Sequence, residues 1–130
     1  FINAVGEDLS GRLIPAVEVR LRGLYRLLPP DYYEAADNLA DFCDRIEKQY
    51  GVRPVIYCTE RTYKNIVASD SRFNKDKIWY ESLFSKPDED MDWTFWTYTN
   101  RVKFSFYESG EYLHMTVFNG SEDDFKKLII

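Results

Sequence analysis

Hydrophobic residues recur along the chain with two different spacings. Between positions 32 and 50 they return every three or four residues, which predicts an amphipathic helix over Tyr32–Tyr50. Asp31 stands where a helix N-cap is expected, and Gly51 stands where the helix should end. Short apolar runs at Leu13–Val19 and Pro54–Thr59 predict a buried strand on either side of this helix.

The second half of the chain is richer in predicted strands than in helices. One more helix is expected over Glu60–Ser69 with Thr59 as its N-cap, followed by a third strand over Ile78–Phe84. The remaining expected elements are strands at Trp93–Thr99, Lys103–Tyr107 and Tyr112–Phe118, a hairpin turn at Glu108–Glu111, and a short helix capped by Ser121 with Asp124 in the capping-box position. This order predicts one α/β domain over residues 1–130, with parallel β/α units first and antiparallel strands later.

Composition and charge exclude some classes of protein. The chain has 130 residues, of which 45% are hydrophobic, and this is enough apolar material for a packed core. A net charge of -5 argues against a nucleic-acid binder, and no apolar run approaches the roughly 20 residues that span a membrane. The opening residues 1–5 lack the basic start of a signal peptide, so we expect the chain to begin inside an element of a longer protein.

The potential metal ligands of the chain do not follow a known metal-binding pattern. Cys43 and Cys58 are interpreted as small core residues, and a disulfide between them stays open. His114 is the only histidine, and no zinc spacing is present. The acidic loop Asp88–Asp92 lacks the ligand spacing of an EF-hand and is interpreted as solvated surface. We therefore expect no metal and no cofactor.

Several stretches match, in order, the motifs of one known family. They are Leu13–Arg20, Tyr50–Tyr57, Ile78–Trp79, Trp93–Tyr98 and Leu113–Gly120. Together they resemble glycoside hydrolase family 25, the lysozyme-like muramidases, whose motifs include Asp-x-Glu, Trp-x-Phe-Trp-Gln-Tyr and Asp-x-Asn-x-Phe. The resemblance implies part of a TIM-like (β/α) barrel, about its last five strands, without counterparts of the family's first three strands and early Asp. It also implies a peptidoglycan-type saccharide as the ligand and a secreted or cell-wall-associated protein.

The polar positions of these motifs depart from the family pattern. Glu18 stands at the Asp of Asp-x-Glu, and Arg20 stands at its Glu, the family's proposed general acid. Thr97 replaces the Gln of the aromatic strand, while His114 and Thr116 replace the late Asp and its companion Asn. Because the surrounding scaffold residues are kept, we hypothesise that the pocket was redesigned or repurposed, in a natural or an engineered protein.

The altered pair bears directly on catalysis. Hydrolysis of a glycosidic bond needs one carboxyl group that protonates the leaving oxygen and a second that acts as base, nucleophile or stabiliser. A guanidinium is in effect always charged, so Arg20 cannot be that proton donor. Positions 18 and 20 share one face of a strand, and an ion pair between them would make Glu18 a poorer acid. We expect muramidase activity to be absent or very weak.

Two other functions stay open. A non-catalytic saccharide-binding module would keep an aromatic groove, although core packing explains most of the aromatic residues. The candidate binding residues are Tyr57, Tyr80, Trp96, Thr97 and Thr116. An enzyme of different chemistry would use Glu18 and His114 as an acid/base pair if the two side chains converge, whereas a lone histidine is more often a hydrogen-bonded part of the core.

A part of a barrel also has free strand edges, which a closed barrel lacks. Such edges need a partner, because their backbone groups are otherwise unpaired. A second copy of the chain, a complementary N-terminal fragment or closure into a smaller sheet would each supply one. We hypothesise that the chain forms a homodimer or is part of a longer molecule.

Overall fold

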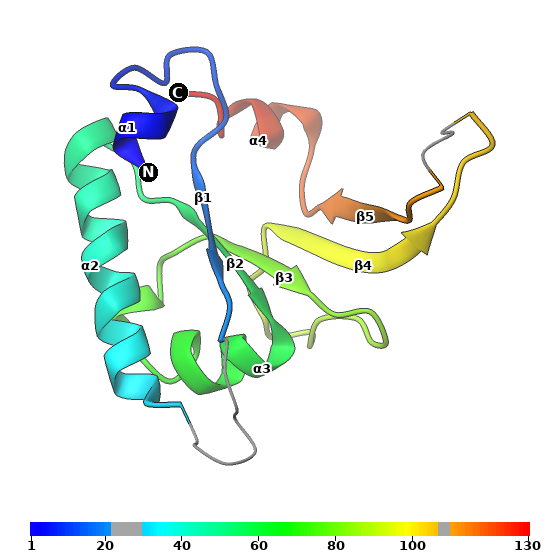
Figure 1. Cartoon of the computed structure of the whole chain (residues 1–130), viewed down its shortest axis with the longest axis horizontal. Helices are drawn as coiled ribbons and strands as arrows, with labels where there is room; N and C mark the ends of the chain where they lie inside the picture. Colours follow the sequence, from blue (N-terminus) through cyan, green and yellow to red (C-terminus); the bar gives the residue numbers. More distant parts are fainter. Residues whose placement is uncertain (22–29, 107–109) are drawn as a thin grey trace.

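A five-stranded sheet in the order β1-β2-β3-β4-β5 lies at the centre of the computed structural model, which describes residues 1–21, 30–106 and 110–130 (Figure 1). The strands are β1 (Ala16–Val19), β2 (Val55–Thr59), β3 (Ile78–Glu81), β4 (Phe95–Val102) and β5 (Leu113–Phe118). Neighbours from β1 to β4 are parallel, and β4 pairs with β5 antiparallel. The predicted α/β fold with a late antiparallel part is confirmed.

The long helix α2 (Tyr32–Tyr50) forms where the apolar spacing predicts it. The Asp31 carboxylate accepts hydrogen bonds from the amides of Tyr33 and Glu34, both at 3.0 Å, and so satisfies two free donors of the first turn. Gly51 ends the helix with φ 74°, a left-handed conformation in which glycine is not strained. Both predicted caps are confirmed.

The other helices are short. They are α1 (Ile2–Val5), α3 (Glu60–Thr62), which continues as a π-helix over Tyr63–Val67, a 3-10 turn at Ser71–Phe73, and α4 (Glu122–Lys126). Thr59 caps α3, and Ser121 and Asp124 form the predicted capping box of α4. The helix expected over Glu60–Ser69 is therefore helical to residue 67 but changes winding, and the consecutive residues Ile66 and Val67 are both buried in its wider part.

Strand bounds differ more from expectation than helix bounds do. β1 begins three residues after Leu13, and β3 ends at Glu81 rather than Phe84. β4 extends to Val102 because its register with β5 shifts twice, so that eight residues of β4 face six of β5. The strand expected over Lys103–Tyr107 is wrong for residues 103–106, while residues 107–109 lie outside the described residues.

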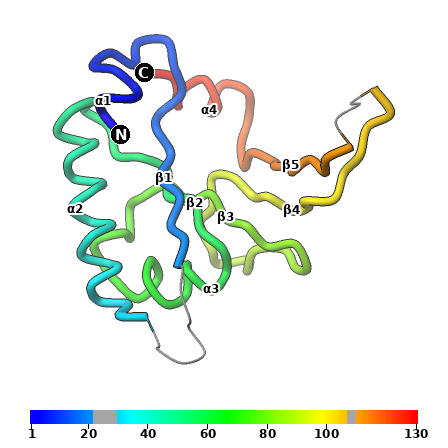
Figure 2. Tube along the Cα trace, in the orientation of Figure 1, coloured from blue at the N-terminus to red at the C-terminus, as the bar shows by residue number. Residues whose placement is uncertain are grey.

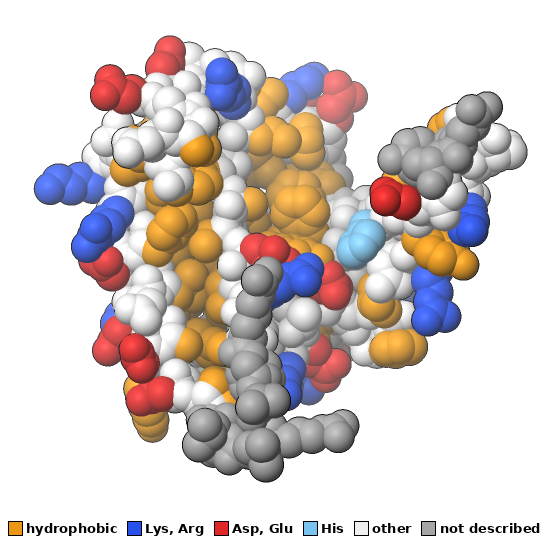
Figure 3. Space-filling model, viewed as in Figure 1, with side chains coloured by type: hydrophobic (Ala, Val, Ile, Leu, Met, Phe, Trp, Pro, Cys, Tyr) orange, Lys and Arg blue, Asp and Glu red, His pale blue; other side chains and the backbone are white. Residues whose placement is uncertain are grey.

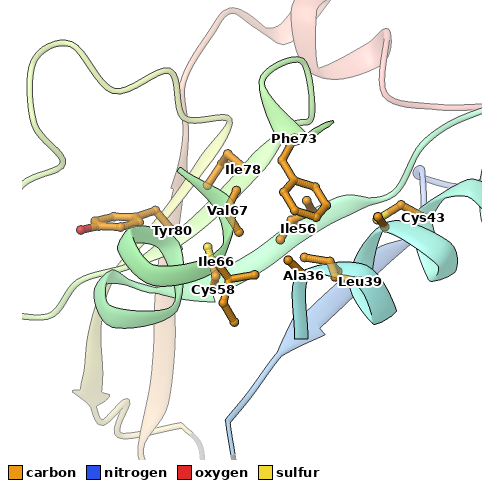
Figure 4. Close-up of a cluster of buried hydrophobic side chains, with 11 residues drawn as sticks. Ala36, Leu39, Cys43, Ile56, Cys58, Ile66, Val67, Phe73, Ile78 and Tyr80 are labelled. Carbon is orange, nitrogen blue, oxygen red and sulfur yellow. The ribbon is translucent and has the colours of Figure 1, made fainter. Parts of the chain in front are cut away.

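Most of the core lies between one face of the sheet and the helices α2 and α3 with the π-helix (Figure 4). Its buried members are Ala36, Leu39, Ala40, Cys43, Ile56, Cys58, Ile66, Val67, Phe73, Ile78 and Tyr80. Both cysteines are free thiols inside this cluster, so they are packed as small apolar residues and are not joined by a disulfide.

Both thiols are expected to resist modification while the chain is folded. Burial raises the pKa of Cys43 to about 11 and that of Cys58 to about 12, and only the thiolate attacks a disulfide reagent. At pH 8 the native protein should therefore react with a thiol-specific dye far more slowly than the urea-unfolded protein does. Rapid labelling of both thiols in the native state would show that they are not buried in the core.

The C-terminal segment pairs with the residues that precede β1. Leu13 and Ile129 form an antiparallel bridge, in which the Ile14 amide donates to Leu128 O at 2.8 Å and the Ile130 amide donates to Arg12 O at 2.9 Å. Figure 2 shows the end of the chain returning beside the segment that precedes β1. The backbone just before β1 therefore has a hydrogen-bonding partner. No strand of the described residues pairs with the outer edge of β1 itself or of β5.

Hydrophobic side chains remain visible on both sides of β1, between α2 and α4 (Figure 3). Leu13 and Ile129 are each nearly half exposed. Self-association through such surfaces stays a prediction. Among the described residues, no helix combines the length and the hydrophobicity needed to cross a bilayer.

Candidate functional site

The face of the sheet away from the helices carries a group of polar side chains at the carboxyl ends of β1, β2 and β3. Ile56, Cys58, Ile78 and Tyr80 point into the core, so the alternate residues of the same strands point to the opposite face. The strand register places Glu18 beside Tyr57, and Thr59 beside Glu81. In open parallel sheets, ligands bind at the carboxyl ends of the strands.

Glu18 and Arg20 form an ion pair at the end of β1, as their spacing predicts. The Arg20 Nε donates a hydrogen bond to the Glu18 carboxylate, and this bond raises the pKa of Arg20. The two side chains are 44% and 58% exposed, so water screens their attraction. The pair therefore contributes little to the stability of the fold and is accessible to a ligand.

A second polar pair lies beside the first. The Tyr57 hydroxyl donates a hydrogen bond to the Glu81 carboxylate, and the Tyr57 ring packs edge-on against Trp79 at 5.2 Å between centroids. Burial, together with the hydrogen bond to Glu81, raises the pKa of Tyr57, so its hydroxyl stays protonated and remains a donor at neutral pH. Sequence reasoning missed Glu81, although its place two residues after Trp79 at the end of a strand was a usable signal.

The two pairs border one pocket of about 350 Å³, which is within the usual size for a small-molecule site. Its lining includes Glu18, Arg20, Leu21, Tyr57, Thr59 and Glu81. The charge of the nearby Glu81 carboxylate also raises the pKa of Arg20. The pocket thus holds a guanidinium beside two carboxylates and a hydroxyl donor.

Thr97 and Thr116 lie on the same face as Glu81 but farther along the sheet. Thr97 pairs with Glu81 in the strand register and is buried, and its Oγ1 lies 2.7 Å from Thr116 Oγ1. The Trp79 indole Nε1 donates to Thr97 Oγ1 at 2.9 Å. These contacts form a hydrogen-bonded chain across β3, β4 and β5 that adjoins the pocket at Glu81.

Tyr80 and Trp96 lie on the helix-covered face, away from Glu18 and Arg20. Tyr80 is buried in the core cluster, where its ring meets Tyr63 at 5.7 Å between centroids. Trp96 packs against the same cluster, and its indole Nε1 donates to Ser82 O at 3.0 Å. Tyr80 and Trp96 are neighbours in the register of β3 and β4. Their side chains therefore lie on the same face of the sheet, the one that packs against the helices.

His114 is not brought to Glu18. It is exposed on β5, and β2, β3 and β4 lie between its strand and β1. The geometry therefore does not favour a Glu18–His114 acid/base pair. Within the described ranges, no group of three or more His, Cys, Asp or Glu side chains is arranged to hold a metal ion.

Comparisons with known proteins show the family and the fold of the chain. The family model described as glycosyl hydrolases family 25 matches residues 2–105. A family 25 glycosyl hydrolase from Bacillus anthracis is 27% identical with a TM-score of 0.75, and the match covers 92% of this chain and 55% of that one. The comparison with curated proteins found no match.

Two further solved structures show the same fold at lower identity. A bacterial lysozyme from Streptomyces coelicolor has 22% identity and a TM-score of 0.69, with 95% of this chain and 60% of that one covered. A lysozyme of the same family from Aspergillus fumigatus has 18% identity and a TM-score of 0.68, with 90% and 56% covered. The chain thus spans little more than half the length of these structures, and its sheet matches part of their barrel. By its sequence match, the chain belongs to glycosyl hydrolase family 25.

Proposed function

We propose that this chain is a family 25 domain whose pocket binds a peptidoglycan-type saccharide without hydrolysing it. The observation that carries this proposal is the ion pair at the end of β1, where the Arg20 guanidinium is bonded to Glu18. The family motif has its proposed general acid at position 20, and an arginine cannot give up a proton at any working pH.

The other carboxylates of the pocket do not supply an obvious substitute. Glu18 already accepts a hydrogen bond from Arg20, and Glu81 accepts one from the Tyr57 hydroxyl. A general acid must instead direct its own proton at the leaving oxygen of the substrate. Loss of turnover with a retained pocket is therefore the reading that the contacts support.

Saccharide binding is supported by the character of the pocket. Carboxylate, guanidinium and hydroxyl groups offer both donors and acceptors to sugar hydroxyls, and the half-buried Tyr57 ring adds an apolar surface. Peptidoglycan is the substrate class that the family implies. The substitutions at positions 18 and 20, which line this pocket, would then make it a repurposed site on a kept scaffold.

We expect the purified protein to bind soluble peptidoglycan fragments while leaving the turbidity of a peptidoglycan suspension unchanged. Replacing Arg20 with alanine should weaken binding roughly 10- to 100-fold, because a hydrogen bond to a charged group contributes about 1.5–3 kcal/mol. Arg45→Ala is the matched control, since Arg45 forms an exposed ion pair with Asp41 on α2, outside the pocket. Calorimetric titration measures the binding.

Two results would count against the proposal. Clearing of the suspension by this protein, abolished in Glu18→Gln, would show that the altered pair still hydrolyses the glycan. If the protein bound none of the peptidoglycan fragments, the proposal that its ligand is a saccharide would be wrong.

A further inference from the structure

The pocket at Glu18 and Arg20 continues into a second hollow of about 440 Å³. The two share Thr59, Arg61 and Glu81, so together they form one groove across the carboxyl ends of β1, β2 and β3. Strands lie about 4.8 Å apart, so the groove crosses roughly 10 Å between β1 and β3. A ligand that fills it is longer than one pyranose ring.

Phe84 lies at the far end of this groove with its side chain fully exposed. It borders the second hollow and also a smaller one of about 200 Å³ beside Asn100 and Arg101. Single exposed apolar residues are common on proteins and need no explanation by themselves. Phe84 differs from such residues because it lines the groove that leads from the candidate site.

The backbone that carries Phe84 is held in place on both sides. The buried Ser82 donates its amide to Thr97 O at 3.2 Å and accepts the Trp96 indole N–H at its carbonyl. The Ser82 and Ser85 hydroxyls lie 3.1 Å apart and bracket the two residues between them. The loop that presents the ring is therefore anchored before a ligand arrives, which reduces the entropy lost on binding.

We propose that Phe84 is a stacking platform for a second sugar ring of the saccharide whose first ring lies at Arg20. The apolar face of a pyranose packs on an aromatic ring, and its hydroxyl groups then need polar partners at the rim. Glu60, Lys64 and Ser82 line the same hollow and offer such groups. This subsite rests on the proposed saccharide-binding function and adds a length requirement to it, so that the ligand is an oligosaccharide.

The test compares affinities for soluble peptidoglycan-type oligosaccharides of increasing length, measured by calorimetry. Wild-type affinity should rise with length, and Phe84→Ala should lose about tenfold on the long ligands but nothing on the shortest. Phe84→Trp should retain the affinity for long ligands. Phe106→Ala is the matched control, because Phe106 is 80% exposed in the segment after β4 and lines neither hollow.

The possible results distinguish the Phe84 subsite from the proposed saccharide-binding function. If the wild type binds long ligands in an Arg20-dependent way and Phe84→Ala binds them equally well, the Phe84 subsite is wrong and the proposed function stands. Equal losses in Phe84→Ala and Phe106→Ala would also overturn the subsite. If the wild type binds no oligosaccharide of any length, both proposals fail.

Discussion

Replacing Arg53 with methionine should lower the free energy of unfolding by about 3–5 kcal/mol. The Arg53 guanidinium donates to both oxygens of Asp76, at 2.6 and 3.2 Å, and the Asp76 side chain is only 1% exposed. Hydrogen bonds to Asp76 raise the pKa of Arg53, and further bonds reach Asp44 and Glu47 on α2. Without Arg53, the Asp76 carboxylate is left buried without its main counter-charge.

Urea unfolding followed by circular dichroism measures this loss. The control is Arg45→Met, which removes a pair with Asp41 whose side chains are 74% and 63% exposed, and which should change stability by less than about 0.5 kcal/mol. The double variant Arg53→Met/Asp76→Asn should recover part of the loss, because a neutral amide no longer requires a counter-charge. Equal stability of Arg53→Met and Arg45→Met would contradict this account of the ion-pair network.

Replacing Ile56 with alanine should cost about 2–5 kcal/mol of stability. Ile56 is fully buried on β2, where it packs within the cluster between the sheet and the helices (Figure 4). Truncation removes buried methyl groups and leaves a cavity that the close-packed neighbours fill only in part. The midpoint of urea unfolding should shift accordingly, with the slope unchanged.

The control for Ile56 is Val117→Ala, since Val117 on β5 is 40% exposed and its truncation leaves no enclosed cavity. A loss below about 1 kcal/mol is expected there. If the two variants proved equally stable, the main core would not lie where the structure places it. At temperatures where Ile56→Ala is folded, its saccharide affinity should equal that of the wild type, because Ile56 and the candidate site lie on opposite faces of the sheet.

This division of the sheet separates the candidate site from the side chains that support the fold. The buried residues that hold the helices to the sheet lie on one face, whereas Glu18 and Arg20 are exposed on the other. Exposed substitutions away from caps and cores change stability little. Under the proposed function, an exchange of the family's acidic pair for Glu18 and Arg20 would remove a proton donor without removing the support of the fold.

Several features of this chain could be read from the sequence because the interactions behind them are local. Helix α2 and its end residues Asp31 and Gly51 depend on contacts within a few positions of the chain. The capping box of Ser121 and Asp124 spans three residues, and the Glu18–Arg20 pair spans two. The family relationship is likewise carried by the order of short motifs, so it needed no coordinates.

Only the tertiary structure decided which residues meet across neighbouring strands and which face of the sheet each side chain occupies. Glu81 meets Tyr57, 24 positions earlier, only because β2 and β3 pair in one particular register. Tyr80 and Trp96 face the helices because those strands bury that side, and the hydropathy of an aromatic residue does not distinguish core from groove. Pairings between distant segments are set by packing of the whole sheet, which no short window of sequence contains.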